Sequence, residues 1–235
     1  MSDHPLVSRA SHDCERRRPT WPAGDGDLAS AEGYIKFRLC WSRDEPPSGI
    51  RQLVHWRNRL YRAGLIGAYP NGTGYGNISV RSNGGFIVSG SATGVHAMAS
   101  AADFTCVTRY AIEGNTVHCR GPVRASSESL THAAVYEASS AVMAVVHAHH
   151  KGIWDALLGK AHTTAAGIPC GTPEMAMEIS RLFKETDVEA HRFFLMGGHE
   201  EGLVGFGGSL RDAAQVLLGL LQRWQSGQGW ACGRF

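Results

Sequence analysis

The sequence predicts a layered α/β domain whose sheet is not purely parallel. In the first half of the chain, short runs of β-branched and aromatic residues are bounded by Gly, Ser and Asn, which favours hairpin strands. Helix signals with capping residues follow, and two further strand-like runs lie between them. A sheet with flanking helices is typical of layered α/β domains, and the hairpin strands argue against a purely parallel arrangement.

Length, composition and charge agree with one globular unit. The chain has 235 residues, 43% hydrophobic and 19% charged, so one large domain or two small ones can form around a packed core. The net charge of +2 indicates no nucleic-acid partner. No apolar run approaches the roughly 18 residues of a membrane span, and residues 1–20 are polar and Arg-rich. We therefore expect a cytoplasmic protein without a membrane partner. Six cysteines without a CxxC motif predict reduced, mostly buried thiols.

The chain begins with an irregular segment before its first regular elements. Residues 1–30 combine prolines, an arginine run and a Gly/Asp stretch without a sustained period, which predicts a flexible arm. Residues 34–41 alternate in strand fashion. Leu53, Trp56 and Leu60 then follow helical spacing, and Gly64 ends that helix.

Further strand and helix signals follow Gly64. Three helix starts carry side chains that can accept a hydrogen bond from the first turn: Ser126 or Ser127, Thr172 before Pro173, and Ser209 in a Ser-x-x-Asp capping box. The predicted strands lie at 77–81, 86–89, 105–110, 141–149 and 193–206.

Histidines near the two last strands form a candidate metal site. His147 and His149 are two positions apart on a predicted strand, so both project from one face, with Cα atoms roughly 7 Å apart. His150 points to the other face, and His199 lies in a Gly-rich turn that can aim it inward. Three nitrogen ligands with an open position suit a catalytic zinc. A single histidine on a strand is more often structural, and spacing alone does not pair His199 with the others.

The order of four separated motifs links these histidines to a known family. The motifs are Gly76-Asn77-Ile78-Ser79, then Ser126-Ser127-Glu128 with His132 four residues on, then His147-Ala148-His149, then His199. This order resembles the class II aldolase/adducin family, which includes fuculose-phosphate aldolase and ribulose-phosphate 4-epimerase. The resemblance spans roughly residues 50 to 222, and each motif alone would be weak.

The resemblance implies an architecture. We expect a three-layer α/β/α sandwich with a central, mainly antiparallel mixed sheet, built from a single domain over residues 31–223. Residues 1–30 would be an arm and residues 224–235 a C-terminal tail. The family also implies a homotetramer, and we expect exposed aromatics such as Trp224 and Trp230 to agree with association.

The resemblance also implies the roles of individual residues. It makes His147, His149 and His199 the ligands of one Zn²⁺ per chain, with another divalent metal as the alternative, and Glu128 the catalytic acid/base. Residues near the phosphate or polar tail of a small-molecule substrate would be Gly76, Asn77, Thr93, Gly94, Ser126 and Ser127. Apart from the family, the Ser126-Ser127-Glu128 motif is also compatible with an ordinary helix start, and the glycines at 72–76 with a plain turn.

The function implied is that of a zinc-dependent aldolase-type lyase. It would act on a sugar phosphate or related hydroxy-carbonyl compound through a metal-stabilised enediolate. The alternatives are an epimerase or dehydratase of the same family, or a non-catalytic adducin-like interaction module, although adducin-like heads lack the metal histidines.

Three departures from the family pattern concern the reaction. The aldolases usually carry Thr-Pro-Thr-Gly where this chain has Val-Ser-Gly-Ser-Ala-Thr-Gly at 88–94, and His-Gly where it has His199-Glu200. No tyrosine follows Tyr136, so the tyrosine acid of the fuculose-type aldolases is missing.

Overall fold

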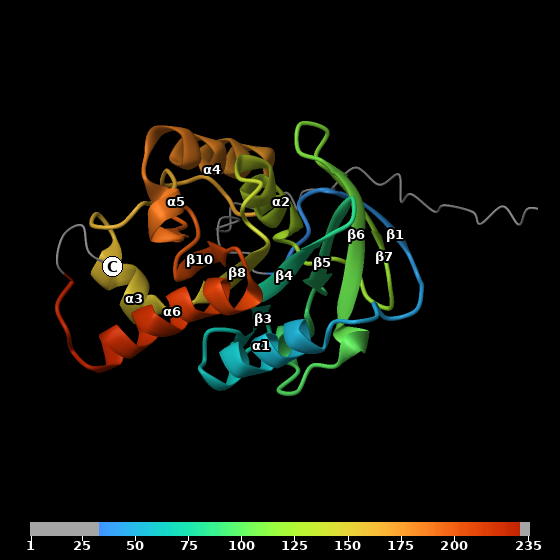
Figure 1. Ribbon diagram of the computed structural model, residues 1–235, viewed down its shortest axis with the longest axis horizontal. Coiled ribbons are helices and arrows are strands. Elements are labelled where there is room, and N and C mark those ends of the chain that lie inside the picture. Colours follow the sequence, from blue (N-terminus) through green and yellow to red (C-terminus); the bar gives the residue numbers. More distant parts are fainter. Residues whose placement is uncertain (1–32, 231–235) are drawn as a thin grey trace, which may run out of the picture.

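Residues 33–230 are described by a computed structural model, and a mixed eight-stranded sheet crosses its centre (Figure 1). The strand order is β1-β7-β6-β5-β4-β8-β10-β9. Only β1 and β7 pair in parallel; all other neighbours are antiparallel, which confirms the mainly antiparallel mixed sheet. The strands are β1 Arg38–Ser42, β4 Asn77–Ser82, β5 Gly85–Ser89, β6 Phe104–Ala111, β7 Thr116–Arg120, β8 Ala144–His149, β9 Phe193–Leu195 and β10 Gly202–Gly207.

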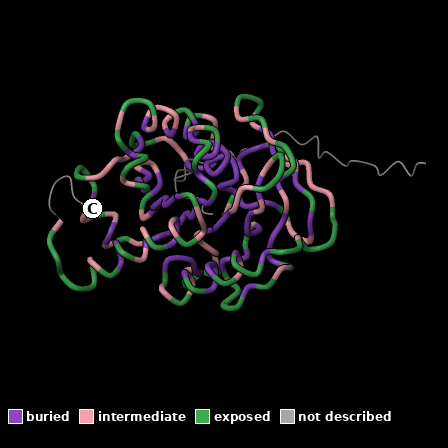
Figure 2. Tube along the Cα trace, viewed as in Figure 1, coloured by how far each residue is buried: buried purple, intermediate pink, exposed green. Residues whose placement is uncertain are grey.

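Helices cover both faces of this sheet, which confirms the three-layer α/β/α sandwich (Figure 1). One hydrophobic cluster packs the sheet against α2 and α4, and a second packs the other face against α1, α3 and α6. The buried trace in Figure 2 accordingly runs through the middle of the molecule. The helices are α1 Arg51–Arg62, α2 Ser129–Ala138, α3 Lys151–Leu157, α4 Pro173–Glu185, α5 Val188–His191 and α6 Leu210–Gln225.

Two predicted helix starts are confirmed and one is corrected. Thr172 accepts a hydrogen bond from Met175 N at the start of α4, and Ser209 accepts one from Asp212 N at the start of α6. Helix α2 begins later than predicted, at Ser129, and its cap position is Glu128 without a side-chain cap. Ser126 Oγ instead accepts from Glu128 N at 3.2 Å, so this serine stabilises the turn that leads into the helix.

The strand predictions are correct in the middle of the chain and incomplete at its ends. The predicted strand 34–41 is shorter, beginning only at Arg38. Sequence reasoning missed β7 and the short helices α3 and α5. The predicted strand 193–206 is two strands, β9 and β10, because a Gly-rich turn at 196–201 separates them. That turn carries His199.

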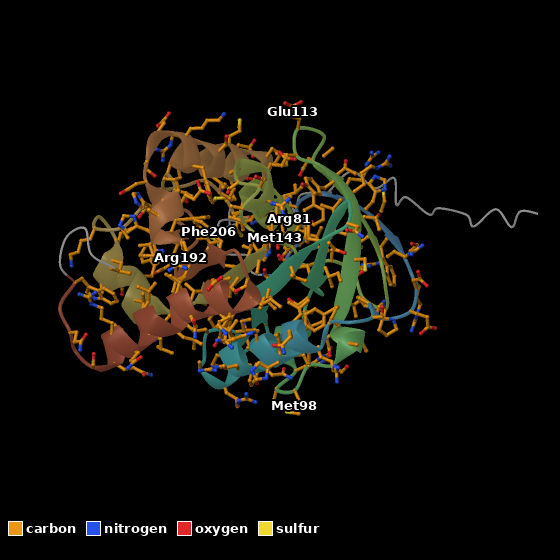
Figure 3. The ribbon with its side chains drawn as sticks, viewed as in Figure 1. Arg81, Met98, Glu113, Met143, Arg192 and Phe206 are labelled. Atoms are coloured by element: carbon orange, nitrogen blue, oxygen red, sulfur yellow. The ribbon has the colours of Figure 1, made fainter. Side chains whose placement is uncertain are left out.

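Arg81 of β4 fixes the end of α2 against the sheet (Figure 3). Its Nη2 donates to Tyr136 O at 2.8 Å and Ser139 O at 3.0 Å, and its guanidinium lies over the Tyr136 ring at 4.7 Å. Charge-assisted hydrogen bonds to the last carbonyls of a helix compensate groups that have no partner within the helix. Arg81 thereby holds the helix whose N-cap position is Glu128.

The predicted arm, residues 1–30, lies outside the described residues, as do positions 231–235 of the predicted tail. Helix α6 extends to Gln225, so the first two tail residues are helical. Arg223 Nη2 donates to Gly229 O at 2.9 Å, and Trp230 is half-buried against the α6 face of the core, contrary to the expected exposure. Trp224 is 43% exposed and contacts the His150 ring.

The cysteines follow the sequence prediction only in part. Cys119 and Cys170 are buried free thiols and Cys106 is a half-buried one, whereas Cys40 of β1 is disulfide-bonded. Among the helices of residues 33–230, none has the length and apolar character needed to cross a membrane.

Candidate metal centre

Three buried histidines converge beside the β8–β10 pair. His147 and His149 project from the same face of β8, with ring centroids 4.8 Å apart. The His199 ring lies 5.2 Å from that of His147 and 4.7 Å from that of His149. One nitrogen of each ring lies within 4.8 Å of the others, and no ring is more than 4% exposed. The structure therefore brings the three predicted ligands together.

Strand register and a tight turn place His199. Gly202 pairs with His149 across the β8–β10 ladder. Gly202 N donates to His199 O at 2.9 Å, and Met196 N donates to Gly202 O at 3.0 Å, which closes the turn. A Cβ atom at Gly202 would lie 2.7 Å from His199 Cδ2, so only glycine leaves room for the ring.

His150 lies apart from these rings, as predicted from the alternation of the strand. Its side chain accepts a hydrogen bond from Ile153 N and caps α3. Its ring packs edge-on against Trp224, with centroids 4.5 Å apart. His150 therefore provides a matched control for the three clustered histidines.

The surroundings of the cluster keep the imidazoles of His147 and His149 neutral. Burial lowers the pKa of His147 well below its ordinary value, and the neighbouring rings of His149 and His199 lower it further. The pKa of His149 is lowered in the same way, by burial and by His199. A neutral imidazole carries the lone pair that a metal requires.

A hydrogen-bond relay from Tyr69 and Glu201 orients His149. The Tyr69 hydroxyl donates to Glu201 Oε2 at 2.9 Å and lies 2.7 Å from His149 Nδ1. Because its one proton goes to Glu201, Tyr69 must accept from His149 Nδ1–H. The Nε2 lone pair of His149 then faces His199 Nε2, 3.0 Å away. Such outer partners fix the tautomer and direction of a ligating histidine.

Sequence reasoning missed Tyr69 and its neighbour Tyr75. Tyr69 directly follows β2 Gly67–Ala68, and Tyr75 is the last residue of its partner strand β3 Gly74–Tyr75. The Tyr75 ring stacks on His149, with ring centroids 5.3 Å apart. The available signal was the Tyr-Pro-Asn-Gly-Thr-Gly-Tyr turn directly before Gly76. Tyrosines from upstream of the His pair thus approach the cluster, although none follows it in sequence.

The side chain of His147 gives the clearest indication that this site binds a group from outside the protein. Among the described side chains, its Nε2 is buried without a hydrogen-bond partner, and so is Asn77 Oδ1. Asn77 Nδ2 lies 3.4 Å from His147 Nδ1. Rotating this amide by 180° would place Oδ1 against Nδ1–H and leave the Nε2 lone pair free, an exchange that amide assignment permits. The donor set therefore fits a divalent metal that prefers imidazole nitrogen.

Glu128 lies beside the histidines. Its carboxylate, the Cys170 sulfur and a His199 nitrogen lie within 4.8 Å of one another, and Glu128 is 1% exposed. Thr131 Oγ1 donates to Glu128 Oε2 at 2.6 Å, which fixes one carboxylate oxygen. Burial raises the pKa of the Cys170 thiol, and the Glu128 charge raises it further, so this cysteine is protonated at neutral pH.

A cation next to Cys170 was also missed. Lys36 is buried, and its Nζ donates to Cys170 O at 3.1 Å and to Cys170 Sγ at 3.3 Å. It reaches this position from the segment before β1, which is 134 residues away in sequence. No local motif indicates such a contact.

The predicted substrate residues lie in three segments: residues 76–77 at the start of β4, the short 3-10 turn at 93–94, and residues 126–127 before α2. Gly76 has φ +72°, and a Cβ atom there would lie 3.1 Å from His147 O, so the chain at Gly76 passes close to strand β8. Thr93 Oγ1 donates within its own turn to Gly90 O, and Gly94 packs on the β2–β3 hairpin. The buried pair Ser126 and Ser127 belongs to a segment that a bridge between Gly90 and Ala125 joins to the turn before Thr93.

His132 belongs to a separate buried network. Its Nδ1 lies 2.6 Å from Ser79 Oγ, which lies 2.7 Å from the Tyr136 hydroxyl. Burial lowers the pKa of His132 to about 3. Its contacts favour packing between β4 and α2 over a place among the metal ligands.

Comparisons with known proteins identify the family of this chain and structures that share its fold. The chain belongs to the class II aldolase and adducin N-terminal domain family, whose model matches residues 51–223. No curated protein matches the sequence.

Solved structures share the fold. An L-fuculose-1-phosphate aldolase from Thermus thermophilus is 23% identical, with a TM-score of 0.55 over 76% of this chain and 95% of its own. YgbL from Klebsiella pneumoniae is 20% identical, with a TM-score of 0.57 over 74% and 86%. A sugar-phosphate aldolase from Thermotoga maritima is 17% identical, with a TM-score of 0.56 over 78% and 97%. At these identities the likeness shows a common fold.

Proposed function

We propose that the protein is a class II, metal-dependent aldolase-type lyase acting on a sugar phosphate or related hydroxy-carbonyl compound. The observation that carries this proposal is the convergence of His147, His149 and His199 beside Glu128. Burying several neutral imidazoles and a carboxylate together is costly for folding, and an apolar core would serve a purely structural module better. Family membership supports the same class of chemistry.

The three imidazoles would hold one divalent ion per chain. Zinc is the ion we assign, because three nitrogen ligands that leave a position open are typical of catalytic zinc. When bound, it would supply a Lewis acid that polarises a substrate carbonyl and stabilises negative charge on its oxygen. Tyr69 and Glu201 would keep His149 in the ligating tautomer.

Glu128 is the residue we assign to proton transfer. Thr131 Oγ1, which donates to Oε2, would hold the carboxylate in position for this transfer. In the cleavage direction the carboxylate would take the proton of the substrate hydroxyl that becomes the aldehyde, directly or through water, and give it to the carbon beside the carbonyl. In the synthetic direction the proton would follow the reverse path. A positioned general base of this kind contributes about 10²–10⁴-fold to the rate.

Lys36 is our candidate for the negative charge of a phosphorylated substrate. Its ammonium contacts Cys170, which is grouped with Glu128 and His199, so it is a cation close to the proposed reaction. Gly76, Asn77, Thr93, Gly94, Ser126 and Ser127 would form the surrounding polar wall. If this assignment is correct, Lys36→Met raises the KM of a ketose phosphate more than that of the free ketose.

The proposal is tested by metal analysis combined with a substrate screen. The purified protein should contain about one zinc per chain at the histidine centre. Ketose phosphates, free ketoses and short aldehydes are then assayed for cleavage, condensation and exchange of the α-proton in deuterated water. A protein that takes up no divalent metal at neutral pH, or that turns over none of these compounds when loaded, contradicts the proposal.

We also infer a homotetramer, on the basis of family membership and of Trp224, which is 43% exposed. Light scattering of active fractions should give about four times the mass of one chain. A mass near 25.3 kDa in active fractions would rule this assembly out.

A further inference from the structure

A second group of metal-ligating side chains lies at the β9 edge of the sheet. His162 Nε2 lies 3.2 Å from His191 Nδ1 and 3.0 Å from Asp187 Oδ1, and His191 Nδ1 lies 3.6 Å from the same oxygen. His191 Nδ1 is also 3.2 Å from Asp187 O. The histidine side chains are about one-fifth exposed, so an ion can reach the group from solvent. We refer to these three residues as the edge cluster.

Two segments distant in sequence meet in the edge cluster. Asp187 and His191 bracket the single turn of α5, which ends at Arg192 in the left-handed conformation (φ +61°), labelled beside α5 in Figure 3. His162 comes from the segment after α3 that lies along β9. Leu195 N donates to His162 O at 2.8 Å, and Thr164 N donates to Leu195 O at 3.0 Å. The backbone thus already holds His162 in place opposite α5.

The triangle of ligand atoms has the size that a small ion requires. A tetrahedral ion bound at 2.0–2.2 Å separates its ligand atoms by about 3.3–3.6 Å. The three separations of the edge cluster, 3.0, 3.2 and 3.6 Å, lie around that range. Hydrogen bonds alone satisfy these three atoms poorly, because a single His162 Nε2–H cannot donate fully to both His191 and Asp187.

We propose that His162, Asp187 and His191 form a second divalent-metal site, separate from the buried histidine centre. Two imidazole nitrogens and one carboxylate oxygen suit zinc among first-row ions, and water would complete the coordination. Binding needs only that each ring offers the lone pair of its inner nitrogen and carries a proton on the outer one. The site does not depend on the proposed reaction.

An ion at the edge cluster would crosslink α5 to the segment after α3. That segment continues to Cys170, and β9 continues into the turn that carries His199. The bound ion would therefore link two chain segments that both lead to the buried centre. Since it crosslinks parts of the folded chain that are separated in the unfolded one, its binding adds stability to the folded protein.

The test separates the two sites by mutation. His147→Ala/His149→Ala removes the buried centre, and zinc or Co²⁺ is then titrated into the full-length protein. We expect about one ion per chain to bind still, with tetrahedral Co²⁺ absorption and a zinc-dependent rise in Tm. Adding His162→Ala/His191→Ala should abolish both signals, whereas adding His55→Ala, a histidine outside both clusters, should leave them.

Two results would overturn the second site. One is a His147→Ala/His149→Ala protein that is folded by circular dichroism yet binds no zinc; the other is zinc binding that persists in the variant carrying His147→Ala/His149→Ala together with His162→Ala/His191→Ala. The reciprocal variant, with only His162→Ala/His191→Ala, should keep the zinc of the buried centre. If this reciprocal variant lost all its zinc, the two sites would not be independent. The activity of the wild-type enzyme tests only the proposed function.

Discussion

The buried histidine centre and the edge cluster each bring three ligand atoms within 4.8 Å of one another, in opposite surroundings. His147, His149 and His199 are at most 4% exposed, whereas Asp187 in the edge cluster is 71% exposed. The buried centre uses nitrogen alone and has Glu128 beside it, while the edge cluster includes its carboxylate among the three ligand atoms. The two groups thus differ more in how far they are buried than in the types of ligand atom they offer.

The difference shows what each group gains from an ion. A buried polar atom without a partner costs about 1–3 kcal/mol, and His147 Nε2 is in that position within the protein. The ligand atoms of the edge cluster contact one another and the side chains are partly exposed to solvent, so an empty edge cluster costs little. We therefore expect tight binding with slow exchange at the buried centre and weaker binding with fast exchange at the edge cluster.

Removing a ligand from the buried centre should have the largest effect. His147→Ala, His149→Ala or His199→Ala is expected to strip the zinc of this centre and abolish turnover, because two remaining nitrogens bind weakly. His150→Ala is the matched control, since His150 caps α3 and contacts Trp224 instead. Elemental analysis of each purified variant after brief chelator treatment measures the outcome. If His150→Ala lost as much zinc as His147→Ala, the ligand assignment would be wrong.

Replacing the acidic residue at each cluster tests whether the two clusters use their carboxylates differently. Glu128→Gln should keep zinc and fold but lower turnover by about 10²–10⁴-fold, because it removes the proton carrier and no ligand. Asp187→Asn should instead weaken zinc binding at the edge cluster and leave turnover unchanged.

The measurement for Glu128→Gln is exchange of the substrate α-proton in deuterated water, which does not require complete C–C cleavage. Exchange at the wild-type rate would reduce Glu128 to a carboxylate at a helix start. Glu201 would then be the next candidate, because Glu200 is exposed and paired with Lys151 at 3.0 Å.

The Tyr69 relay distinguishes the buried centre further, and its loss should have an intermediate effect. Tyr69→Phe removes the acceptor of His149 Nδ1–H and frees the wrong tautomer, so we expect zinc affinity to fall by about 10–100-fold. Competition with a chromophoric chelator gives the dissociation constant.

Tyr75→Phe is the control for the relay. The Tyr75 ring also contacts His149, but its hydroxyl donates to Gly64 O at 3.3 Å. Equal affinities of the two variants would show that the Tyr69 hydroxyl has no special role in orienting His149.

The sequence predicted what depends on local pattern or on motif order. The α1 stripe, the caps at Thr172 and Ser209, and the pairing of His147 with His149 on one strand face all arise from spacing within a few residues. Motif order supplied the mixed sheet and the link to His199. The contacts that were missed, Lys36 with Cys170 and Tyr69 with His149, join segments 134 and 80 residues apart. They depend on strand order, which no local period contains.

The edge cluster escaped prediction for a similar reason. His162 lies 29 residues before His191, and only the pairing of its segment with β9 brings the two rings together. The relay residue Glu201 was closer to prediction, because the Glu200-Glu201 pair departs from the His-Gly of the family. Sequence showed that a carboxylate was added there, but not which of the two turns inward to Tyr69.

The smallest expected effect concerns acid stability without metal, and it compares buried with half-exposed histidines. Burial lowers the pKa of His132 to about 3, while in the unfolded chain the group titrates near 6.5. Between these values the unfolded state binds a proton that the folded state does not. The free energy of unfolding therefore falls as pH falls below 6.5, by about 1.4 kcal/mol per pH unit for each such group. The pKa values of His147 and, less deeply buried, His162 are lowered too, so they act with the same sign.

His132→Asn tests this contribution, because the Asn side chain can accept from Ser79 in place of Nδ1 and does not titrate. The Ser79 contact with Tyr136 and the neighbouring His147 remain in place. Urea unfolding in chelator between pH 7 and 5 should show a slope against pH that is shallower by up to about 1.4 kcal/mol per unit than in wild type. His162→Asn should reduce the slope less, because solvent reaches that ring. If His132→Asn left the slope unchanged while His162→Asn reduced it, the half-exposed cluster would govern acid sensitivity, and burial would not be what separates the two groups.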